Sequence, residues 1–327
     1  MREWILYEIH PGTFSPEGDL RAAEKYLPEL KELGVNAIEI MPIAQFPGKY
    51  NWGYDGVYPF AVHNTYGRPE DLLHFVQTCH ELELSVCLDV VYNHLGPEGN
   101  YLRDFGPYFT DRYHTPWGEA LNFDGAGSDA VRHYFIENAL MWLRDYNMDA
   151  LRLDAVHAIA DSSAYPFLNE LSDRVNALAR TQNRPLYLIA ESDRNDPGAL
   201  RPAPVGQGLH ATWADDFHHC VHKLLTGEQD GYYADYAADS TEQLYRAYTE
   251  GFVFTGQYSR YRQRRHGRPT ENLNDDQFII CIQNHDQVGN RMRGERLSAL
   301  VTPEALKLAA ALLLLAPFPP LLFMGEE

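Results

Sequence analysis

Short apolar runs alternate with longer stretches in which apolar residues recur at helical spacing along most of this 327-residue chain. Runs such as SVCLDVVY and ALRLDAV are apolar on both faces of a strand, which is typical of a parallel sheet covered by helices. The predicted strands cover residues 4–9, 37–43, 85–92, 150–156, 185–192, 211–217, 278–285 and 320–325. The predicted helices cover residues 20–33, 69–84, 129–146, 163–181 and 303–315.

Eight strands in a regular βα alternation predict an α/β fold, the closed (β/α)8 TIM barrel, which typically needs about 250 residues. The extra length lies mainly in 95–128, rich in Gly, Pro, Tyr and Asp, and in the mixed segment 227–276. We therefore expect residues 1–327 to form one barrel, with 95–128 inserted as an excursion subdomain after the third strand. The chain ends soon after the eighth predicted strand, so the helix that covers this strand is expected outside these residues.

The composition is strongly acidic, with 27 Lys and Arg residues against 46 Asp and Glu residues and a formal net charge of −19. Such a surface repels phosphate backbones, which argues against nucleic acid as a partner and suits a neutral substrate. The basic run RYRQRRHGR at 260–268 is therefore interpreted as a solvated loop or a sugar-facing rim. The longest apolar run, 308–324, is broken by prolines and too short for a membrane span, so no membrane partner is expected.

The four cysteines, Cys79, Cys87, Cys220 and Cys281, have neither metal-ligand nor redox spacing. Buried free thiols in a reducing compartment are the simplest interpretation. The N-terminus MREWILYEIHPG turns acidic too soon for a signal peptide. These features predict a cytoplasmic protein, and we expect it to need no metal and no other cofactor.

Polar and aromatic residues collect after the predicted strands, on the rim where TIM barrels place their active sites. They follow six successive strands, from the second to the seventh. The residues concerned are Trp52, Tyr54 and Asp55; Asp89, Asn93 and His94; Arg152, Asp154 and His157; Glu191; Asp215, Asp216, His218 and His219; and His285, Asp286 and Asn290.

The stretch DALRLDAVH places two charges in an otherwise apolar strand. Because side chains alternate along a strand, Arg152 and Asp154 share the inner face, and the leucines between them face the helices. A nearby guanidinium favours the ionised carboxylate that a nucleophile needs. Asp154 and Glu191, on neighbouring strands, then supply the two carboxyl groups of glycoside hydrolysis. At the same rim, Asp286, His285 and His94 are suited to assist at the sugar, and Trp52 and Tyr54 to stack on its ring.

Each of these features has a simpler interpretation. The Arg–Asp pair is often only a structural ion pair. His218, His219 and His222 have the helical spacing of a metal site, but the exposed faces of a helix N-terminus explain them better, because no complete ligand set is present. Asp215 and Asp216 would then cap that helix. A structural interpretation must nevertheless account for six strand ends at once, so the convergence favours an active site.

The strings DVVYNH, RLDAVH, LIAES and QNHD resemble the four signature regions of the alpha-amylase family of retaining glycoside hydrolases, in the order of that family. The resemblance covers essentially the whole chain, and the segment 95–128 resembles the family's excursion domain. It implies that Asp154 is the nucleophile, Glu191 the general acid/base and Asp286 the stabiliser of the transition state. It further implies that Arg152, His94, His285 and Tyr54 surround the sugar at the cleavage point.

Further strings, among them YEIHPGTFSPEG, DDFHH and LLTGEQDGYYADY, resemble the family members that act on maltooligosyltrehalose. The activity implied is hydrolysis of the α-1,4 bond next to the terminal trehalose. Val156 stands where many amylases have Lys on the leaving-group side, and the N- and C-terminal β-domains of these relatives are absent from the sequence. The implied cleft residues are Arg152, Leu153, Ala155, Val156 and His157; Asp215, Asp216, Phe217, His218 and His219; and His285, Gln287, Val288, Gly289 and Asn290.

Two other functions remain open at this stage. A glucan branching transferase shares the WGYD and FMGEE-like strings. A barrel that binds glucans without cleaving them would be marked by the loss of one of the three acids, and all three are present.

Overall fold

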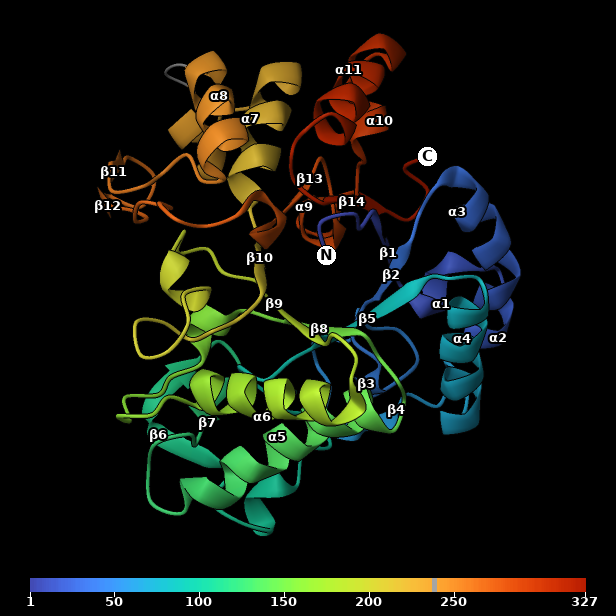
Figure 1. Cartoon of the computed structure of the whole chain (residues 1–327), viewed down its shortest axis with the longest axis vertical. Coiled ribbons are helices and arrows are strands. Elements are labelled where there is room, and N and C mark those ends of the chain that lie inside the picture. Colours follow the sequence, from blue (N-terminus) through green and yellow to red (C-terminus); the bar gives the residue numbers. More distant parts are fainter. Residues whose placement is uncertain (237–239) are drawn as a thin grey trace.

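The computed structural model describes residues 1–236 and 240–327. Within these ranges, eight parallel strands close into a barrel whose order around the barrel follows the order along the chain, which confirms the predicted TIM-barrel fold (Figure 1). The barrel strands are β1 (Leu6–Ile9), β2 (Ala37–Ile40), β5 (Ser85–Val90), β8 (Ala150–Leu153), β9 (Tyr187–Ala190), β10 (Ala211–Trp213), β13 (Phe278–Cys281) and β14 (Pro320–Phe323).

Each predicted strand contains an observed one. Asp89 and Arg152 remain in the sheet, whereas Asp154, Glu191 and His285 lie beyond the ends of the observed strands. The sixth strand, predicted over 211–217, ends at Trp213, and the seventh, predicted over 278–285, ends at Cys281, so the prediction is also wrong for 282–285. Asp215 and Asp216 instead form the first turn of a helix, where carboxylates are stabilised by the partial positive charge of the helix N-terminus. The strand prediction is therefore wrong for 214–217.

The predicted helices are present, with two changes. The first divides into two helices around a 3-10 turn, at the point where Pro28 enters the chain. The second change is that two longer helices occur where none was predicted, one within the segment 227–276 and one directly before it. The helices are α1 (Pro11–Phe14), α2 (Leu20–Ala23), α3 (Leu27–Leu33), α4 (Pro69–Glu81), α5 (Ser128–Arg144), α6 (Phe167–Gln182), α7 (Asp215–Thr226), α8 (Ser240–Glu250), α9 (His285–Gly289), α10 (Leu297–Leu300) and α11 (Pro303–Leu314).

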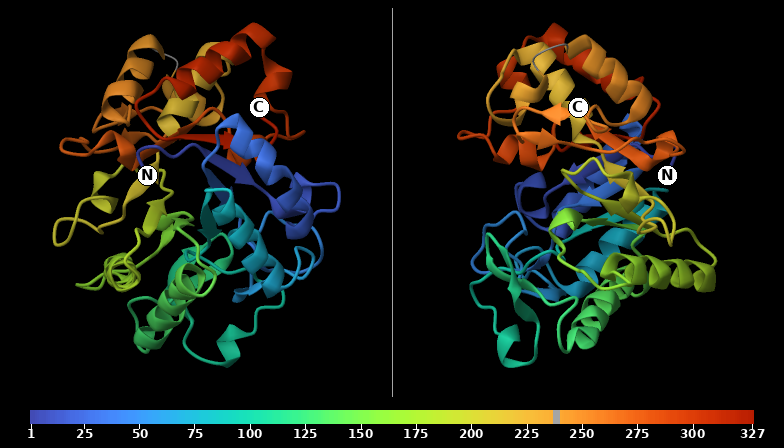
Figure 2. Two further views of the ribbon diagram at one scale, coloured as in Figure 1. Left: turned by 45° about the vertical axis from the view of Figure 1, so that its right-hand side comes forward. Right: turned by 90° about the vertical axis from the view of Figure 1, so that its left-hand side faces the viewer.

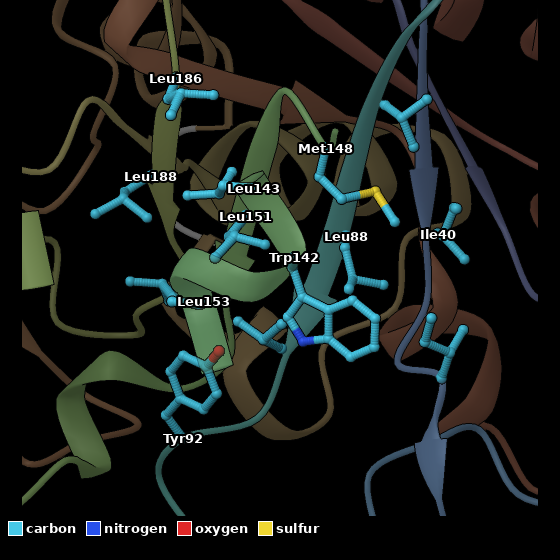
Figure 3. Packing of buried hydrophobic residues seen from close by; sticks show 14 of the residues in the cluster. Ile40, Leu88, Tyr92, Trp142, Leu143, Met148, Leu151, Leu153, Leu186 and Leu188 are labelled. Carbon is cyan, nitrogen blue, oxygen red and sulfur yellow. The ribbon is translucent and has the colours of Figure 1, made fainter. Parts of the chain in front are cut away.

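The main core lies between the outer face of the barrel and its helices. Leu88, Leu151 and Leu188 point outward from three consecutive strands and meet Trp142 of α5 and the neighbouring Met148 (Figure 3). All five are essentially inaccessible to solvent. Burial of such side chains contributes about 1.5–3 kcal/mol each, so this layer holds the helices against the strands.

The inside of the barrel has two layers of different character. Because side chains alternate along a strand, positions two apart lie in successive inner layers. The lower layer is apolar and includes Leu6, Ala37, Cys87 and Ala150. Two residues further along the same four strands are Glu8, Glu39, Asp89 and Arg152, all buried. A charged layer thus lies directly under the mouth of the barrel.

Smaller sheets decorate the barrel. They are β3 (Ala44–Gln45) with β4 (Tyr58–Val62), β6 (Phe109–Thr115) with β7 (Gly118–Leu121), and β11 (Tyr258–Ser259) with β12 (Arg264–Arg265), all antiparallel. The β6–β7 hairpin lies within the segment 95–128. Figures 1 and 2 show it near α5 and α6, at the end of the molecule opposite α7, α8 and α11. The basic run 260–268 forms the β11–β12 hairpin.

Short 3-10 turns complete the structure at 24–26, 102–104, 156–158, 197–199, 231–236 and 275–277. All four cysteines are buried and free. Across the residues that the structure describes, no helix is both long enough and apolar enough to cross a membrane.

Candidate active site

Arg152 is the centre of the mouth of the barrel. Its side chain has no solvent exposure, and Nη1 donates hydrogen bonds to Asp89 Oδ2 at 2.7 Å and to Asp154 Oδ1 at 2.9 Å. Nη2 lies 3.7 Å from Glu191 Oε2. The guanidinium also lies over the Trp213 ring, 4.2 Å from its centroid. One buried cation therefore connects three carboxyl groups from three adjacent strand ends.

Asp154 follows β8 directly and points into the mouth, as the strand alternation predicts. Its side chain is 14% exposed. Arg152 donates to Oδ1, and Asn93 Nδ2 donates to Oδ2 at 2.7 Å, so both oxygens accept a hydrogen bond from a positioned N–H group. Held in this way, the carboxylate is fixed in orientation and still reachable from the cleft.

Glu191 follows β9, which is the neighbour of β8 in the barrel. The backbone N–H of Ala155 donates to its Oε2 at 2.6 Å. Ala155 itself has a left-handed backbone, with φ of 39°, an uncommon conformation that is often found at functional sites. Burial raises the pKa of Glu191 to about 8, the Asp154 carboxylate adds to the rise, and Arg152 opposes it. Glu191 therefore holds a proton at neutral pH.

His285 and Asp286 open the short helix α9 on the other side of the mouth. His285 is buried, whereas the Asp286 side chain is 49% exposed, with Oδ1 3.7 Å from His285 Nε2. Burial disfavours the charged imidazole, but the carboxylates of Glu8 and Asp286 outweigh it and raise the pKa of His285 to about 9. Tyr54 stacks on the His285 ring with centroids 5.1 Å apart. The predicted group of His285, Asp286 and Tyr54 is therefore brought together.

His94 forms the wall between the mouth and the excursion segment. Its Nε2 is 2.7 Å from the Tyr54 carbonyl oxygen and its Nδ1 is 2.5 Å from Asn93 Oδ1. Burial lowers the pKa of His94. The Trp117 ring, from the loop of the β6–β7 hairpin, stacks on it at 3.6 Å, and Trp117 Nε1 donates to Asp55 Oδ1 at 3.0 Å. Sequence reasoning gave Trp117 no role at the site, because nothing local indicates where a hairpin loop folds back.

The sixth strand end contributes less than predicted. Asp216 accepts from Asn195 Nδ2, from the N–H groups of Val253 and Phe254, and from Tyr236 Oη. Both ring nitrogens of His218 have partners within the protein, Phe217 lies in the core, and His219 is 8% exposed and adjoins Tyr236. The predicted cleft positions of Asp216, Phe217 and His218 are therefore corrected to buried positions.

Asp215 behaves differently from its neighbour. Asp215 is partly exposed and neither caps α7 nor makes a hydrogen bond within the described residues. Burial, followed by the charges of Asp286 and Asp216, raises its pKa to about 7, and Arg152 and His285 oppose the rise. Asp215 is thus the residue of the DDFHH stretch that shares the electrostatic environment of the mouth. The expected exposed helix faces for His218, His219 and His222 are wrong, since all three are buried.

The other predicted residues divide between two cavities and the core. Leu153 is a core residue, 1% exposed, and faces the helices, so its predicted cleft position is corrected. A cavity of about 360 Å³ is lined by Trp52, Tyr54, His285, Asp286, Gly289 and Asn290. A cavity of about 630 Å³ is lined by Val156, His157, Tyr165, Ser192, Arg194 and Arg268, among others. Gln287 and Val288 are partly exposed on α9.

Gly289 has a steric role beside Trp52. A side chain at this position would place its Cβ 2.5 Å from the indole ring, far inside van der Waals contact. The absence of a side chain lets Trp52 close the smaller cavity.

The sequence predictions missed two buried acids, Glu8 and Glu39. They lie with Asp89, which was predicted at the rim without a role, in the charged layer around Arg152 and His285. In the described part of the chain, no group of three or more His, Cys, Asp or Glu side chains has the arrangement of a metal site.

Comparisons with known proteins found relatives of this chain. Residues 7–115 match the family model described as alpha amylase, catalytic domain. Malto-oligosyltrehalose trehalohydrolases from Saccharolobus solfataricus and Arthrobacter ramosus are 50% and 51% identical over 99% of this chain, which spans 56% of each of them. A crystal structure of a candidate alpha amylase from Salmonella typhimurium superposes with a TM-score of 0.93 at 45% identity, over 100% of this chain and 56% of that one. The chain thus spans about half the length of these relatives.

Proposed function

Because this chain belongs to the alpha-amylase family of glycoside hydrolases, we propose that it forms the catalytic barrel of an enzyme that hydrolyses α-1,4-glucans with retention of configuration. The observation that carries the proposal is the pair of carboxyl groups beside one buried arginine, which donates to Asp154 and lies 3.7 Å from Glu191. Asp154 accepts hydrogen bonds on both oxygens, and Glu191 retains a proton on the adjacent strand end. A nucleophile and a proton donor side by side are the requirement of the retaining mechanism.

In the first step, an Asp154 oxygen attacks the anomeric carbon while Glu191 gives its proton to the glycosidic oxygen. The bond between the anomeric carbon and the glycosidic oxygen breaks, the leaving sugar departs with the proton, and a glycosyl ester forms on Asp154. In the second step, the Glu191 carboxylate takes a proton from water, whose oxygen attacks the same carbon and frees Asp154. Asp286, partly exposed beside His285, is placed to stabilise the positive charge that develops on the sugar ring.

We further propose that the substrate is maltooligosyltrehalose and that trehalose is the leaving group. The support is the name shared by relatives with 44–51% identity over almost the whole chain. We assign the leaving-group side to the cavity of about 630 Å³, because it adjoins Ser192, next to the proton donor. Its lining includes Val156, at the position where many amylases have Lys, together with His157 and Tyr165. An apolar side chain there favours a different leaving group.

The test is product analysis by chromatography after incubation of the chain with maltooligosyltrehalose. Free trehalose together with a shortened maltooligosaccharide is the expected result. Incubation with amylose tests the second candidate, a branching transferase, which is favoured by a 30% identity over 274 residues to a glucan branching enzyme from Bacillus caldolyticus. New α-1,6 branches would replace the hydrolase proposal with that activity. Binding without turnover, measured by calorimetry, would indicate a barrel that only binds glucan.

We also propose that the protein works in the cytoplasm. Its four free, buried thiols fit a reducing compartment.

A further inference from the structure

Glu8 lies in the charged inner layer of the barrel, on β1. Its side chain is fully buried, and both carboxylate oxygens contact the same residue, 277 positions away in sequence. Oε1 is 2.5 Å from His285 Nδ1, and Oε2 accepts from the His285 backbone N–H at 3.1 Å. Glu8 therefore fixes both the backbone and the ring of the histidine that precedes Asp286.

The opposite side of the His285 ring continues this hydrogen-bond chain. Nε2 is 2.7 Å from Tyr54 Oη, and Tyr54 Oη donates to Asp89 Oδ2 at 2.6 Å. A phenol that donates its single hydrogen to Asp89 can only accept from the imidazole. Nε2 must therefore carry a hydrogen, and Nδ1 carries another, because its partner is a carboxylate. The geometry requires both ring nitrogens of His285 to be protonated.

We infer that Glu8 is a positioning residue for the proposed reaction: it holds His285 as an imidazolium, so that the ring fixes Tyr54 and lies against Asp286. The chain of contacts runs from Glu8 through His285, Tyr54 and Asp89 to Arg152, and so joins the two halves of the mouth. The inference rests on the proposed function for its effect on turnover, but not for its effect on His285.

The electrostatic surroundings of His285 agree with this role. The elements packed around the ring contribute mostly acidic groups and two basic ones. The titratable and charged groups that act on it or contact it are Glu8, Glu39, Tyr54, Asp89, Asp215 and Asp286, with His10 and Arg152 as the basic ones. Burial alone would lower the pKa of such a histidine, so the carboxylate of Glu8 has to offset it.

Glu39 supplies a matched control. It lies opposite Glu8 in the β1–β2 register and in the same inner layer, and it is 1% exposed. Unlike Glu8, neither of its oxygens has a hydrogen-bond partner among the described residues. Burial, with the charge of Glu8, raises the pKa of Glu39 well above its ordinary range, so replacement by neutral glutamine disturbs Glu39 less than it disturbs Glu8.

The experiment compares Glu8→Gln and Glu39→Gln in the 327-residue chain, labelled with 15N-histidine. NMR spectra of the ring nitrogens, recorded from pH 5 to 10, report the protonation of His285, whose signals are identified by their loss in His285→Gln. We expect the wild-type ring to be doubly protonated at pH 7.5. In E8Q it should be neutral at that pH, and in E39Q it should match the wild type.

Activity on maltooligosyltrehalose is the second readout. For E8Q we expect kcat to fall by about 10- to 100-fold with little change in KM, the range found when a carboxylate that orients a metal-bound histidine is removed. E39Q should keep kcat. A neutral His285 in the wild type at pH 7.5, or an E8Q variant with unchanged spectrum or unchanged kcat, would overturn the inference. If the wild type turns over no glucan, the proposed function fails while the spectra still decide the role of Glu8. If E8Q does not fold, the wild-type spectrum decides it alone.

Discussion

Replacement of Asp154 by asparagine should remove turnover and leave the fold intact. The amide keeps the shape of the side chain but cannot form the glycosyl ester, so kcat should fall by about 10⁴-fold or more, as for other catalytic nucleophiles and their partners. The measurement is the rate of trehalose release, with unfolding followed by circular dichroism. Asp129→Asn, at an exposed carboxylate in the first turn of α5, is the control and should keep wild-type activity. Near-normal turnover by D154N would exclude Asp154 as the nucleophile.

The rate of hydrolysis should fall as pH rises through about 8. Glu191 has a pKa raised to about 8, and only its protonated form can give a proton to the leaving oxygen, so the active form is lost above that pH. The measurement is kcat against pH on maltooligosyltrehalose. A maltosyl fluoride, whose leaving group needs no proton, should show a weaker alkaline loss. A constant rate between pH 7 and 9.5 on the natural bond would contradict the assignment of Glu191.

At the scale of single residues, the sequence was informative where chemistry and strand alternation coincide. The charges of Arg152 and Asp154 in an apolar strand predicted a shared inner face, and the structure shows it. The same signal is present in LYEI and AIEI, where Glu8 and Glu39 interrupt apolar strands. It could have predicted that these acids are buried, but their partners depend on which strands meet across the barrel. No local pattern pairs residue 8 with residue 285.

At the scale of elements, Asp215 and Asp216 are neighbours in α7 with different roles: Asp216 accepts hydrogen bonds inside the protein, whereas Asp215 faces the charges of the mouth. Asp216→Ala should destabilise the protein by about 2–4 kcal/mol, because it leaves buried donors of the 253–254 loop, Asn195 and Tyr236 without an acceptor. Chemical denaturation measures this free energy of unfolding.

Asp215→Ala is the matched comparison. Its carboxyl makes no hydrogen bond in the described structure, so the free energy of unfolding should change by less than about 1 kcal/mol. The effect should instead be a weaker affinity for maltooligosaccharides, measured by calorimetry. Equal loss of stability in both variants would show that Asp215 is as structural as Asp216.

The same helix shows why parts of the secondary structure could not be predicted. The apolar strands and the helix α4, with Leu72, Phe75, Val76 and Cys79 on one face, follow regular periods. In α7, buried histidines and Lys223 interrupt the apolar period, and hydrogen bonds to the protein satisfy them instead. In α8, a mostly polar helix, Leu244 and Tyr248 form a short apolar face that packs on a buried cluster around Phe217. An apolar face of this length is too short to predict a helix from the sequence.

At the scale of the whole molecule, stability should be greatest near pH 6–7. Four acids and one histidine have raised pKa values: Asp89 about 6, Asp215 about 7, Glu191 and Glu326 about 8, and His285 about 9. The folded state holds these protons more tightly than the unfolded state. Their contribution is therefore complete below the unfolded pKa values, about 4 for the acids and about 6.5 for the histidine, and is lost progressively as pH rises to about 9.

Buried histidines act in the opposite direction on the acid side. Burial lowers the pKa of His218 to about 3 and also lowers the pKa values of other histidines, so that more groups gain a proton on unfolding below pH 6.5 than lose one. The other histidines are His10, His63, His94, His157, His210, His219, His222 and His266. The free energy of unfolding should therefore decrease on both sides of the maximum. Denaturation with urea at pH 5, 6.5 and 9, at constant ionic strength, measures it. A steady rise from pH 6.5 to 9 would contradict the raised values.

The seam of the barrel joins the first strand to the last, and the same seam anchors His285. β1 pairs with β14, and Glu8 binds a residue 277 positions later. At about 5–20 residues per second of synthesis, Glu8 leaves the ribosome tens of seconds before its partner exists. In the nascent chain, the Glu8 carboxylate, which is buried in the folded barrel, is therefore exposed to solvent until the last strands have been synthesised. Barrel closure and assembly of the site are consequently one late event, and a chain interrupted before it has neither a closed barrel nor a complete site.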